Sequence, residues 1–264
     1  EKVSTGSQNT CIGRSAGGAI TTGSGNTLLG YLAGEDLSAG VNNVAIGFEA
    51  LKSETNYGRN VAVGFGALQT QNANVHAYNV ALGYSAGASV NTGKQNTFLG
   101  GKTGETLTTG ENNTIIGYSS TQSAVDVDNE ITLGNSSVSA LRCAVTSITS
   151  LSDERDKSEI KDLQYGLDFI DSLQPREFVW DNRAEITKEY DEEGNATEVE
   201  FYSANKGKKD FGFIAQEVQS VDDDTLRLVY DENPDKLELS YGKLVPVLVQ
   251  AIKELKAEIE LLKS

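Results

Sequence analysis

Apolar residues recur at fixed places in a short unit that repeats along the first half of the chain. The unit is an asparagine, then threonine or valine, a small or apolar residue, an aliphatic residue and a glycine. The closing glycines are 17 residues apart, with a single interval of 19 residues. They are Gly13, Gly30, Gly47, Gly64, Gly83, Gly100, Gly117 and Gly134, and the last unit is a degenerate Glu130–Gly134. A fixed period of this length predicts a repeat architecture.

Each unit has the features of one coil. The residues before the glycine are apolar and favour a short strand. The glycine permits a positive φ that turns the chain, and a polar stretch then returns it to the next unit. Because a 17-residue coil cannot bury its apolar face alone, successive coils must stack. We therefore predict a β-solenoid or β-roll over residues 1–140, with strands pairing between successive coils or between chains.

The pattern changes to that of an α+β domain over residues 152–264, with residues 141–151 as a linker. Apolar positions at Ile160, Leu163, Leu167 and Ile170 predict an amphipathic helix over residues 157–173 that Pro175 ends. Strands are predicted at residues 177–180, 198–202 and 211–215, the last leading into a short helix. Two further short strands, at residues 226–230 and 236–239, flank a turn.

A helix is predicted over residues 241–264. Its apolar residues alternate at spacings of three and four, which is typical of a coiled-coil seam and compatible with a trimer. The alternative is one amphipathic helix packed on its own domain. The seam consists of Val245, Leu248, Ile252, Leu255, Ile259 and Leu262.

Composition changes at the same junction. Residues 1–151 carry seven lysines and arginines against ten acidic residues, while residues 152–264 carry fifteen against twenty-eight. The total net charge of −16 argues against a nucleic-acid partner. No apolar run approaches the roughly 20 residues that span a bilayer, so we expect no membrane insertion. Methionine is absent, and we expect this chain to be the C-terminal piece of a longer polypeptide.

No cofactor or metal site is predicted. Cys11 and Cys143 lack metal-ligand spacing, and Cys11 occupies an apolar slot of the repeat where burial is expected. The Gly-Lys-Thr sequence at residues 101–103 is interpreted as a turn, because a phosphate loop would need glycine at Asn96. An acidic run at residues 126–130 lacks the glycine and final glutamate of a calcium loop, and is interpreted as a solvated strand edge.

Two features of the repeats are candidates for recognition. His76 lies in the 19-residue interval and, with no second histidine or cysteine nearby, is interpreted as a loop residue. The alternative is a receptor contact, since irregular loops on rigid scaffolds often carry recognition. Aromatic residues follow several of the closing glycines, where they could form a sugar-stacking ladder or lie in the core; we expect the core. These aromatics are Tyr31, Phe48, Phe65, Tyr84 and Tyr118.

The repeats resemble two kinds of known repeat over residues 5–135. One is the left-handed β-roll of trimeric autotransporter adhesin heads, and the other occurs in phage tail-fibre and tailspike shafts. Both contain similar Asn-x-Val-Ala-Ile-Gly units followed by a spaced alanine. The resemblance implies an architecture and leaves the ligand open.

The second half resembles the C-terminal intramolecular chaperone of endosialidases, phage tailspikes and tail fibres, which also occurs in myelin-regulatory-factor-type transcription factors. The resemblance implies a domain that trimerises, drives folding of the β-rich trimer ahead of it and then releases itself by serine–lysine autoproteolysis. The motifs that carry it are Ser-Asp-Glu-Arg-Asp-Lys at 152–157, Ile160, Phe178-x-Trp180, Gly-Phe-Ile-Ala-Gln-Glu-Val at 212–218 and Tyr-Gly-Lys-Leu-Val-Pro at 241–246.

Carried over by this resemblance, the nucleophile is Ser152, the base is Lys157 and the scissile bond is Leu151–Ser152. A serine hydroxyl needs an adjacent base, and a lysine amine becomes one only when desolvation or nearby positive charge lowers its pKa. Arg155 and Lys161 could supply that charge. The alternative is that Ser152 or Asp153 only caps a helix.

Spacing restricts how the pair can meet. Residues five apart on a regular helix are separated by about 140° around its axis, so Ser152 and Lys157 cannot meet on one intact helix. Either Ser152 lies outside the helix start, or the lysine comes from a neighbouring chain.

The sequence thus predicts the C-terminal end of a homotrimeric viral fibre or spike. Its chaperone domain would act as a single-turnover self-cleaving serine peptidase with no other substrate. We expect assembly in the host cytoplasm, release of the chaperone, and a virion fibre that contacts a host-surface receptor, a glycan or a protein. The alternative is a trimeric bacterial surface adhesin fragment with a structural C-terminal stalk and no cleavage. A glycan-degrading spike is not supported, since no carboxylate pair stands out.

Overall fold

The computed structural model describes residues 5–144, 151–181, 185–190, 196–201, 205–222, 225–231 and 233–263. The chain divides into two compact units, residues 1–137 and residues 138–264, which are described separately. Across the described residues, none of the helices has both the length and the apolar character needed to span a bilayer.

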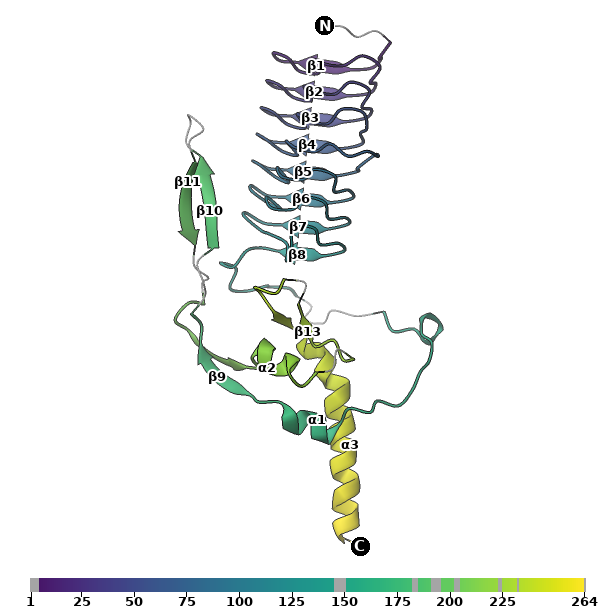
Figure 1. Ribbon diagram of the computed structural model, residues 1–264, viewed down its shortest axis with the longest axis vertical. Coiled ribbons are helices and arrows are strands. Elements are labelled where there is room, and N and C mark those ends of the chain that lie inside the picture. The colour runs from purple at the N-terminus through teal and green to yellow at the C-terminus, as the bar shows by residue number, and fades with distance from the viewer. Residues whose placement is uncertain are drawn as a thin grey trace. The chain divides into compact units, whose positions relative to one another are not determined.

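The first unit is a β-solenoid in which eight three-residue strands stack coil upon coil into one parallel sheet (Figure 1). Neighbouring strands pair at equivalent positions of the repeat, as in Thr10↔Thr27 and Val61↔Val80. This confirms the predicted solenoid and places the pairing between successive coils of one chain. The strands are β1 Thr10–Ile12, β2 Thr27–Leu29, β3 Val44–Ile46, β4 Val61–Val63, β5 Val80–Leu82, β6 Thr97–Leu99, β7 Thr114–Ile116 and β8 Ile131–Leu133.

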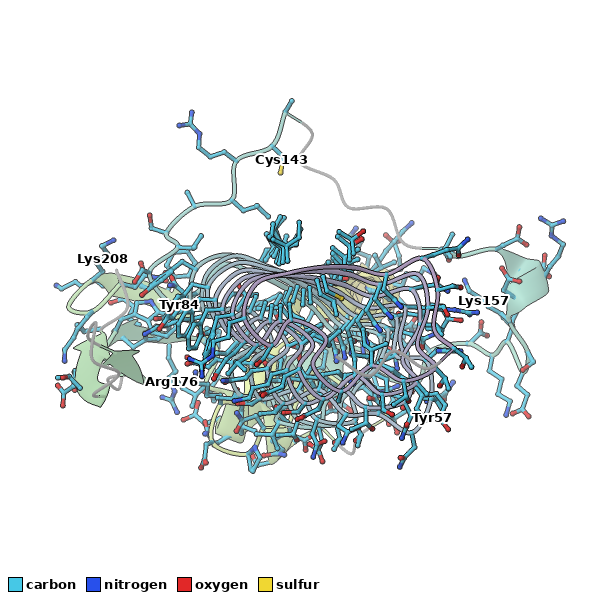
Figure 2. All side chains as sticks on the ribbon, turned by 90° about the horizontal axis from the view of Figure 1, so that it is seen from above. Tyr57, Tyr84, Cys143, Lys157, Arg176 and Lys208 are labelled. Carbon is cyan, nitrogen blue, oxygen red and sulfur yellow. The ribbon has the colours of Figure 1, made fainter. Side chains whose placement is uncertain are left out.

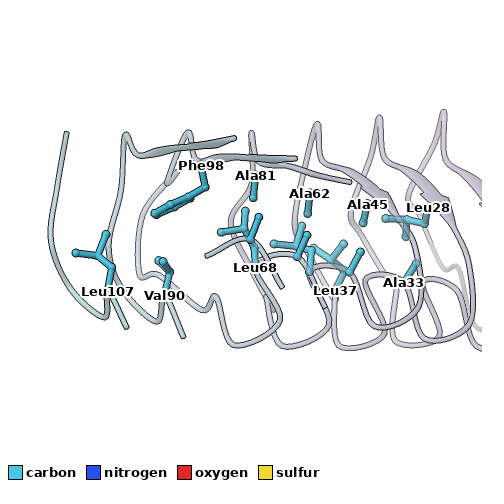
Figure 3. Close-up of a cluster of buried hydrophobic side chains, with 14 of the residues drawn as sticks. Leu28, Ala33, Leu37, Ala45, Ala62, Leu68, Ala81, Val90, Phe98 and Leu107 are labelled. Atoms are coloured by element: carbon cyan, nitrogen blue, oxygen red, sulfur yellow. The ribbon is translucent and has the colours of Figure 1, made fainter. Parts of the chain in front are cut away.

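The core runs through the middle of the stack. Viewed along it, the coils superpose (Figure 2), and apolar side chains fill their interior (Figure 3). The central residue of a strand points inward, so Leu28, Ala45 and Phe98 are fully buried, while the residues on either side of it face outward. This alternation follows from the two-residue period of a strand.

In the six units that open with Asn26 to Asn113, the asparagine is buried and bonds to both neighbouring coils. At Asn96 the main-chain N–H donates to Oδ1 of Asn79 (2.9 Å), and the side-chain Nδ2 donates to the carbonyl of Gly110 (2.7 Å). Oδ1 of Asn96 accepts in turn from the main-chain N–H and the Nδ2 of Asn113 (2.9 and 3.0 Å). The same pattern links Asn9, Asn26 and Asn43. We call this row the asparagine ladder.

The 19-residue coil interrupts this pattern. Its two extra residues fall between Gln71 and Asn79, and Asn79 gives an Nδ2 hydrogen to Oε1 of Gln71 (2.7 Å). Nδ2 of Asn60 is buried and has no partner among the described residues. Glu54 and Gln71 both replace an apolar core residue, because the equivalent places in other coils hold Ile20, Leu37, Val90 and Leu107.

Glu54 is a fully buried acid in this core column. Its Oε1 accepts the main-chain N–H of Tyr57 (3.2 Å), whereas its Oε2 has no partner among the described residues. Burial raises the pKa of the Glu54 carboxyl above its ordinary value, although main-chain N–H groups, first that of Tyr57, oppose the shift. The acid therefore anchors the turn at Tyr57 in the coil that precedes the 19-residue interval.

Two expectations about buried residues are wrong for this chain. The repeat aromatics are exposed, and those from Tyr31 to Tyr84 stack on one another along one side of the solenoid, with ring centroids 4.8 Å apart for Phe48 and Phe65 and 5.2 Å apart for Phe65 and Tyr84. They avoid the core because the turn at each glycine directs the following side chain outward. Cys11 is also exposed, since its strand β1 lies at the end of the sheet and has one neighbouring strand.

The second unit combines short antiparallel strand pairs with helices. β9 pairs with β12, β10 with β11, and β13 with β14. The expected strands and turn are thus present, except that the strand predicted at residues 211–215 ends at Gly212 and α2 begins at Ala215. β10 is a strand that the sequence pattern did not predict. The elements are the 3-10 helix η1 Glu154–Asp156, α1 Leu167–Ser172, β9 Arg176–Val179, β10 Glu185–Tyr190, β11 Ala196–Phe201, β12 Lys209–Gly212, α2 Ala215–Gln219, β13 Val229–Tyr230, β14 Glu238–Leu239, the 3-10 helix η2 Tyr241–Lys243 and α3 Leu244–Lys263.

The predicted helix over residues 157–173 is wrong for most of its length, because α1 begins only at Leu167. A distant residue sets this start: the Glu254 carboxylate on α3 accepts the main-chain N–H of Leu167 (2.6 Å). Gly166 precedes the helix at a place where an added Cβ would lie 2.2 Å from that carboxylate. A local apolar pattern could not reveal this tertiary cap.

The terminal helix α3 has two apolar faces. Val247 and Ala251 are buried, and Val247 packs in one cluster with Phe169, Leu173 and Val218. The six residues of the predicted seam lie elsewhere on the helix, and the five of them from Val245 to Ile259 are each 42–64 % exposed. The helix therefore does pack on its own domain, but it does so with residues outside the seam.

The asparagine ladder yields a stability prediction. Asn96→Ala should lower the free energy of unfolding by about 3 kcal/mol, because it removes three buried side-chain bonds worth about 1 kcal/mol each. Asn60→Ala is the matched control and should lower it by about 1 kcal/mol, since the Asn60 side chain makes only the bond from the main-chain N–H of Asn79. Equilibrium urea unfolding followed by circular dichroism measures both, and equal losses would contradict the ladder's role.

A second prediction concerns pH. The raised pKa of Glu54 means that its contribution to stability is complete below the unfolded pKa of about 4.5 and is lost as the pH rises through the higher folded value. The melting temperature of the solenoid should thus fall as the pH rises from 4 toward neutrality, and Glu54→Gln should flatten this fall. Glu54→Leu should flatten it too, but at a lower melting temperature, because leucine cannot accept the Tyr57 N–H. An unchanged slope in Glu54→Gln would exclude this explanation.

Candidate functional site

Ser152 and Lys157 meet within one chain. Nζ of Lys157 lies 2.5 Å from Oγ of Ser152 and 3.2 Å from the Ser152 carbonyl oxygen. Ser152 precedes the 3-10 helix η1 and Lys157 follows it, so neither residue is helical. This is the first of the two arrangements that the five-residue spacing allowed.

A short capped turn brings the two side chains together. Asp153 is the N-cap of η1, and its Oδ1 accepts the main-chain N–H of Arg155 (2.9 Å). The Arg155 guanidinium also donates to both oxygens of Asp153, at 3.0 and 2.6 Å. This two-point contact lowers the pKa of Asp153. Capping thus falls to Asp153, which leaves the Ser152 hydroxyl available to Lys157.

The pair is open to water in the single chain. Ser152 and Lys157 are exposed, and the Leu151 side chain is 100 % exposed. The two cations expected to act on the lysine are paired with acids instead, Arg155 with Asp153 (2.6 Å) and Lys161 with Glu159 (4.0 Å). A lysine base requires desolvation or uncompensated positive charge nearby. The turn therefore brings the amine close to the serine hydroxyl but does not supply the environment that would activate it.

The other motif residues build the domain. The hydroxyl of Tyr241 accepts the main-chain N–H of Phe213 (3.0 Å), and a Cβ added to Gly212 would lie 2.5 Å from that hydroxyl. Arg176 on β9 donates two bonds to Glu217 on α2 (3.0 and 2.8 Å) and lowers the pKa of Glu217. These contacts explain why a glycine, an acid and a tyrosine are needed at those positions of the motifs.

The Gly-Lys-Thr sequence at residues 101–103 and the acidic run at residues 126–130 have structural roles. Lys102 is only 5 % exposed, and the Thr103 hydroxyl donates to the carbonyl of Gly117 (2.7 Å), as expected of a turn. Glu130 accepts the main-chain N–H of Ser123 (3.1 Å) and the hydroxyl of Thr132 (2.7 Å) within its own coil. Among the described residues, no three acidic, histidine or cysteine side chains are grouped as a metal site would require.

Comparison with known proteins gives one match. Residues 152–227 match the peptidase S74 family model, described as chaperone of endosialidase. No curated protein matches the chain, and no solved structure matches it. The matched segment begins at Ser152 and includes η1, α1 and α2, and it ends before β13. From Ser152 to Arg227 this chain is therefore similar to the chaperone of endosialidase family.

Proposed function

We propose that this chain is the end of a homotrimeric fibre or spike joined to its own folding chaperone, which detaches by cutting the Leu151–Ser152 bond. The observation that carries the proposal is the 2.5 Å contact between Lys157 Nζ and Ser152 Oγ, at the first residue of the segment similar to the chaperone of endosialidase family. The solenoid ahead of it is the kind of β-rich fibre that such a chaperone would assemble.

The proposed chemistry uses two side chains and water. Neutral Lys157 takes the proton of the Ser152 hydroxyl as Oγ attacks the Leu151 carbonyl carbon. The carbon–nitrogen bond breaks, and the new α-amino group of Ser152 receives the proton from Lys157. Water then hydrolyses the ester between Leu151 and Oγ, which frees the Leu151 carboxylate and restores the serine. Each chain reacts once.

Self-association is supported by two exposed apolar rows. On the solenoid, the third residue of every strand is aliphatic and faces outward, so in-register pairing aligns eight such side chains over about 34 Å at about 4.8 Å per strand. Exposed apolar rows of this size mark association surfaces. The row is Ile12, Leu29, Ile46, Val63, Leu82, Leu99, Ile116 and Leu133. The second row is the α3 seam, whose three- and four-residue spacing fits a coiled coil of identical chains.

Assembly would also supply what the exposed pair lacks. Packing of neighbouring subunits around the turn at residues 152–157 would remove water from Lys157 and lower its pKa, because desolvation disfavours the charged amine. Cleavage would then follow trimerisation. Removing residues 152–264 would also remove a net charge of −13 and leave residues 1–151 with −3.

We place the released fibre on a virion, where it would contact a host-surface receptor after assembly in the host cytoplasm. The alternative, an adhesin fragment with a structural stalk, requires no reaction at Ser152. It would also leave the capped turn beside Lys157 without a role.

The first prediction of this proposal concerns cleavage. Purified wild-type protein should yield fragments of 151 and 113 residues on a denaturing gel, with masses that fix the cut between Leu151 and Ser152. Ser152→Ala and Lys157→Ala should abolish both fragments. Lys161→Ala is the matched control, since it removes an exposed lysine four residues further on and should leave cleavage intact. Intact wild-type trimers after prolonged incubation would refute self-cleavage.

The second prediction is that cleavage depends on trimer formation. Ile252→Glu together with Ile259→Glu places charges in the α3 seam and should prevent trimer formation, measured by analytical ultracentrifugation. Because the pair then stays exposed, cleavage should be lost although Ser152 and Lys157 are unchanged. Lys253→Glu and Lys256→Glu, which lie off the seam, are the control and should preserve both. Cleavage by a monomeric seam variant would show that assembly is not required.

A further inference from the structure

One surface of the solenoid departs from the chain's own repeat. Tyr57 stands ten residues after a closing glycine, where other coils have Gly23, Gly40, Gly93 and Gly110. Arg59 and Tyr78 stand directly before a ladder asparagine, where other coils have Gln8, Gly25, Asn42, Gln95, Asn112 and Asn129. The two extra residues of the 19-residue coil fall at the same place. The loop between β4 and β5 accordingly extends beyond the neighbouring coils (Figure 1).

The backbone at two of these positions suits other residues better. The position before the ladder asparagine is left-handed throughout the described coils, with φ of 65° at Arg59 and 56° at Tyr78. Glycine and asparagine adopt this conformation readily, whereas long or aromatic side chains rarely do. Strain of this kind concentrates at functional sites. Nothing in the coil itself requires an arginine or a tyrosine here.

The departing residues form one cluster, which we call the aromatic patch: Tyr57, Arg59, His76 and Tyr78. The His76 ring lies 5.9 Å from the Tyr57 ring at 82° and 6.3 Å from the Tyr78 ring at 76°. The Arg59 guanidinium lies 5.4 Å from the Tyr78 ring centroid and donates to the Tyr78 hydroxyl. Nδ1 of His76 is buried without a partner among the described residues. Rings and a cation from two neighbouring coils thus share one surface.

This surface differs from the stacked aromatic row on the other side of the coil. Viewed along the solenoid, Tyr57 and Tyr84 lie on opposite sides of the coil outline (Figure 2). The rings of that row cover one another's faces, with interplanar angles of 4° for Phe48 and Phe65 and 14° for Phe65 and Tyr84. In the aromatic patch the rings stand nearly perpendicular, and Tyr78 remains 47 % exposed.

The charge of the patch indicates the ligand. Lys52 and Lys94 on the solenoid surface are paired with Glu49 (3.0 Å) and Glu111 (2.9 Å). Arg59 forms no ion pair within the part of the chain that the structure describes. An arginine without an acid can bind a carboxylate through two parallel bonds. The exposed tyrosine surface can pack against the C–H groups of a sugar ring while the sugar hydroxyls stay hydrated.

We propose that the aromatic patch binds a saccharide that carries a carboxylate, as in a uronic-acid residue of a surface glycan. Arg59 binds the carboxylate, Tyr57 and Tyr78 pack against the sugar ring, and the His76 ring contacts and supports both tyrosine rings. The inference rests on the proposed attachment role of the solenoid and gives that role a site and a ligand class.

Saturation-transfer NMR on the wild-type full chain tests it with D-galacturonate and D-galactose, which differ by a carboxylate in place of a CH2OH group. Galacturonate should show the stronger transfer. Arg59→Asn and Tyr78→Asn restore the residue that the repeat uses at this position, so both should fold with an equal or higher melting temperature. Arg59→Asn should weaken galacturonate binding about tenfold and remove the preference over galactose. Tyr78→Asn should abolish transfer to both sugars.

Arg14→Gln is the matched control, because Arg14 lies over the Tyr31 ring at 5.6 Å in the same way but belongs to the stacked aromatic row and not to the aromatic patch. It should leave binding unchanged. No transfer to wild-type protein, equal transfer to the two sugars, or equal losses in Arg14→Gln and Arg59→Asn would each overturn the proposal. A denaturing gel of the same samples reports cleavage separately, so failed sugar binding and failed self-cleavage are distinguishable.

Discussion

The asparagine ladder holds the solenoid in register, because each ladder side chain bonds to the coil before it, to the coil after it, or to both. These bonds lie inside the stack, where an unpaired amide costs about 1–3 kcal/mol. A change in coil length therefore has a visible consequence. In the 19-residue coil the Asn60 Nδ2 loses its partner, and Gln71 has to enter the core to bond with Asn79. The 17-residue period is thus the coil length at which the ladder asparagines can bond to one another and to the adjacent coils.

Because the ladder keeps the strands in register, it also aligns the side chains at equivalent positions of successive strands. The inward row becomes a continuous core, and the outward third position becomes an apolar row that one chain cannot cover. On α3 the same situation arises from helical spacing, since Val247 and Ala251 are buried while the seam is exposed. Both units thus bury one apolar row and present another. In the proposed homotrimer, copies of the same chain would supply matching rows at both places.

The sequence predicts what depends on local periodicity and misses what depends on distant contacts. The 17-residue period predicts eight strands and their pairing order, and heptads predict α3. The pattern over residues 157–173 misleads because Glu254, far along the chain, caps α1 at Leu167. Periodicity places the repeat aromatics on one shared face but does not say whether that face points inward. The prediction that they lie in the core is wrong for this reason. The aromatic patch was detectable in principle, since its residues break the chain's own repeat.

Bringing Lys157 to Ser152 and removing water from the lysine are separate requirements for the proposed cleavage. The capped turn, fixed by Asp153 and Arg155, brings Lys157 to Ser152 from six consecutive residues, so proximity needs no other part of the chain. The same turn pairs Arg155 with an acid and leaves the lysine exposed to water. Under the proposed mechanism the reaction must wait for burial, and burial requires other subunits. A turn that formed the contact and also buried it would cut each chain before the solenoid had assembled. Under that mechanism, local geometry combined with burial by other subunits would make cleavage a consequence of completed folding.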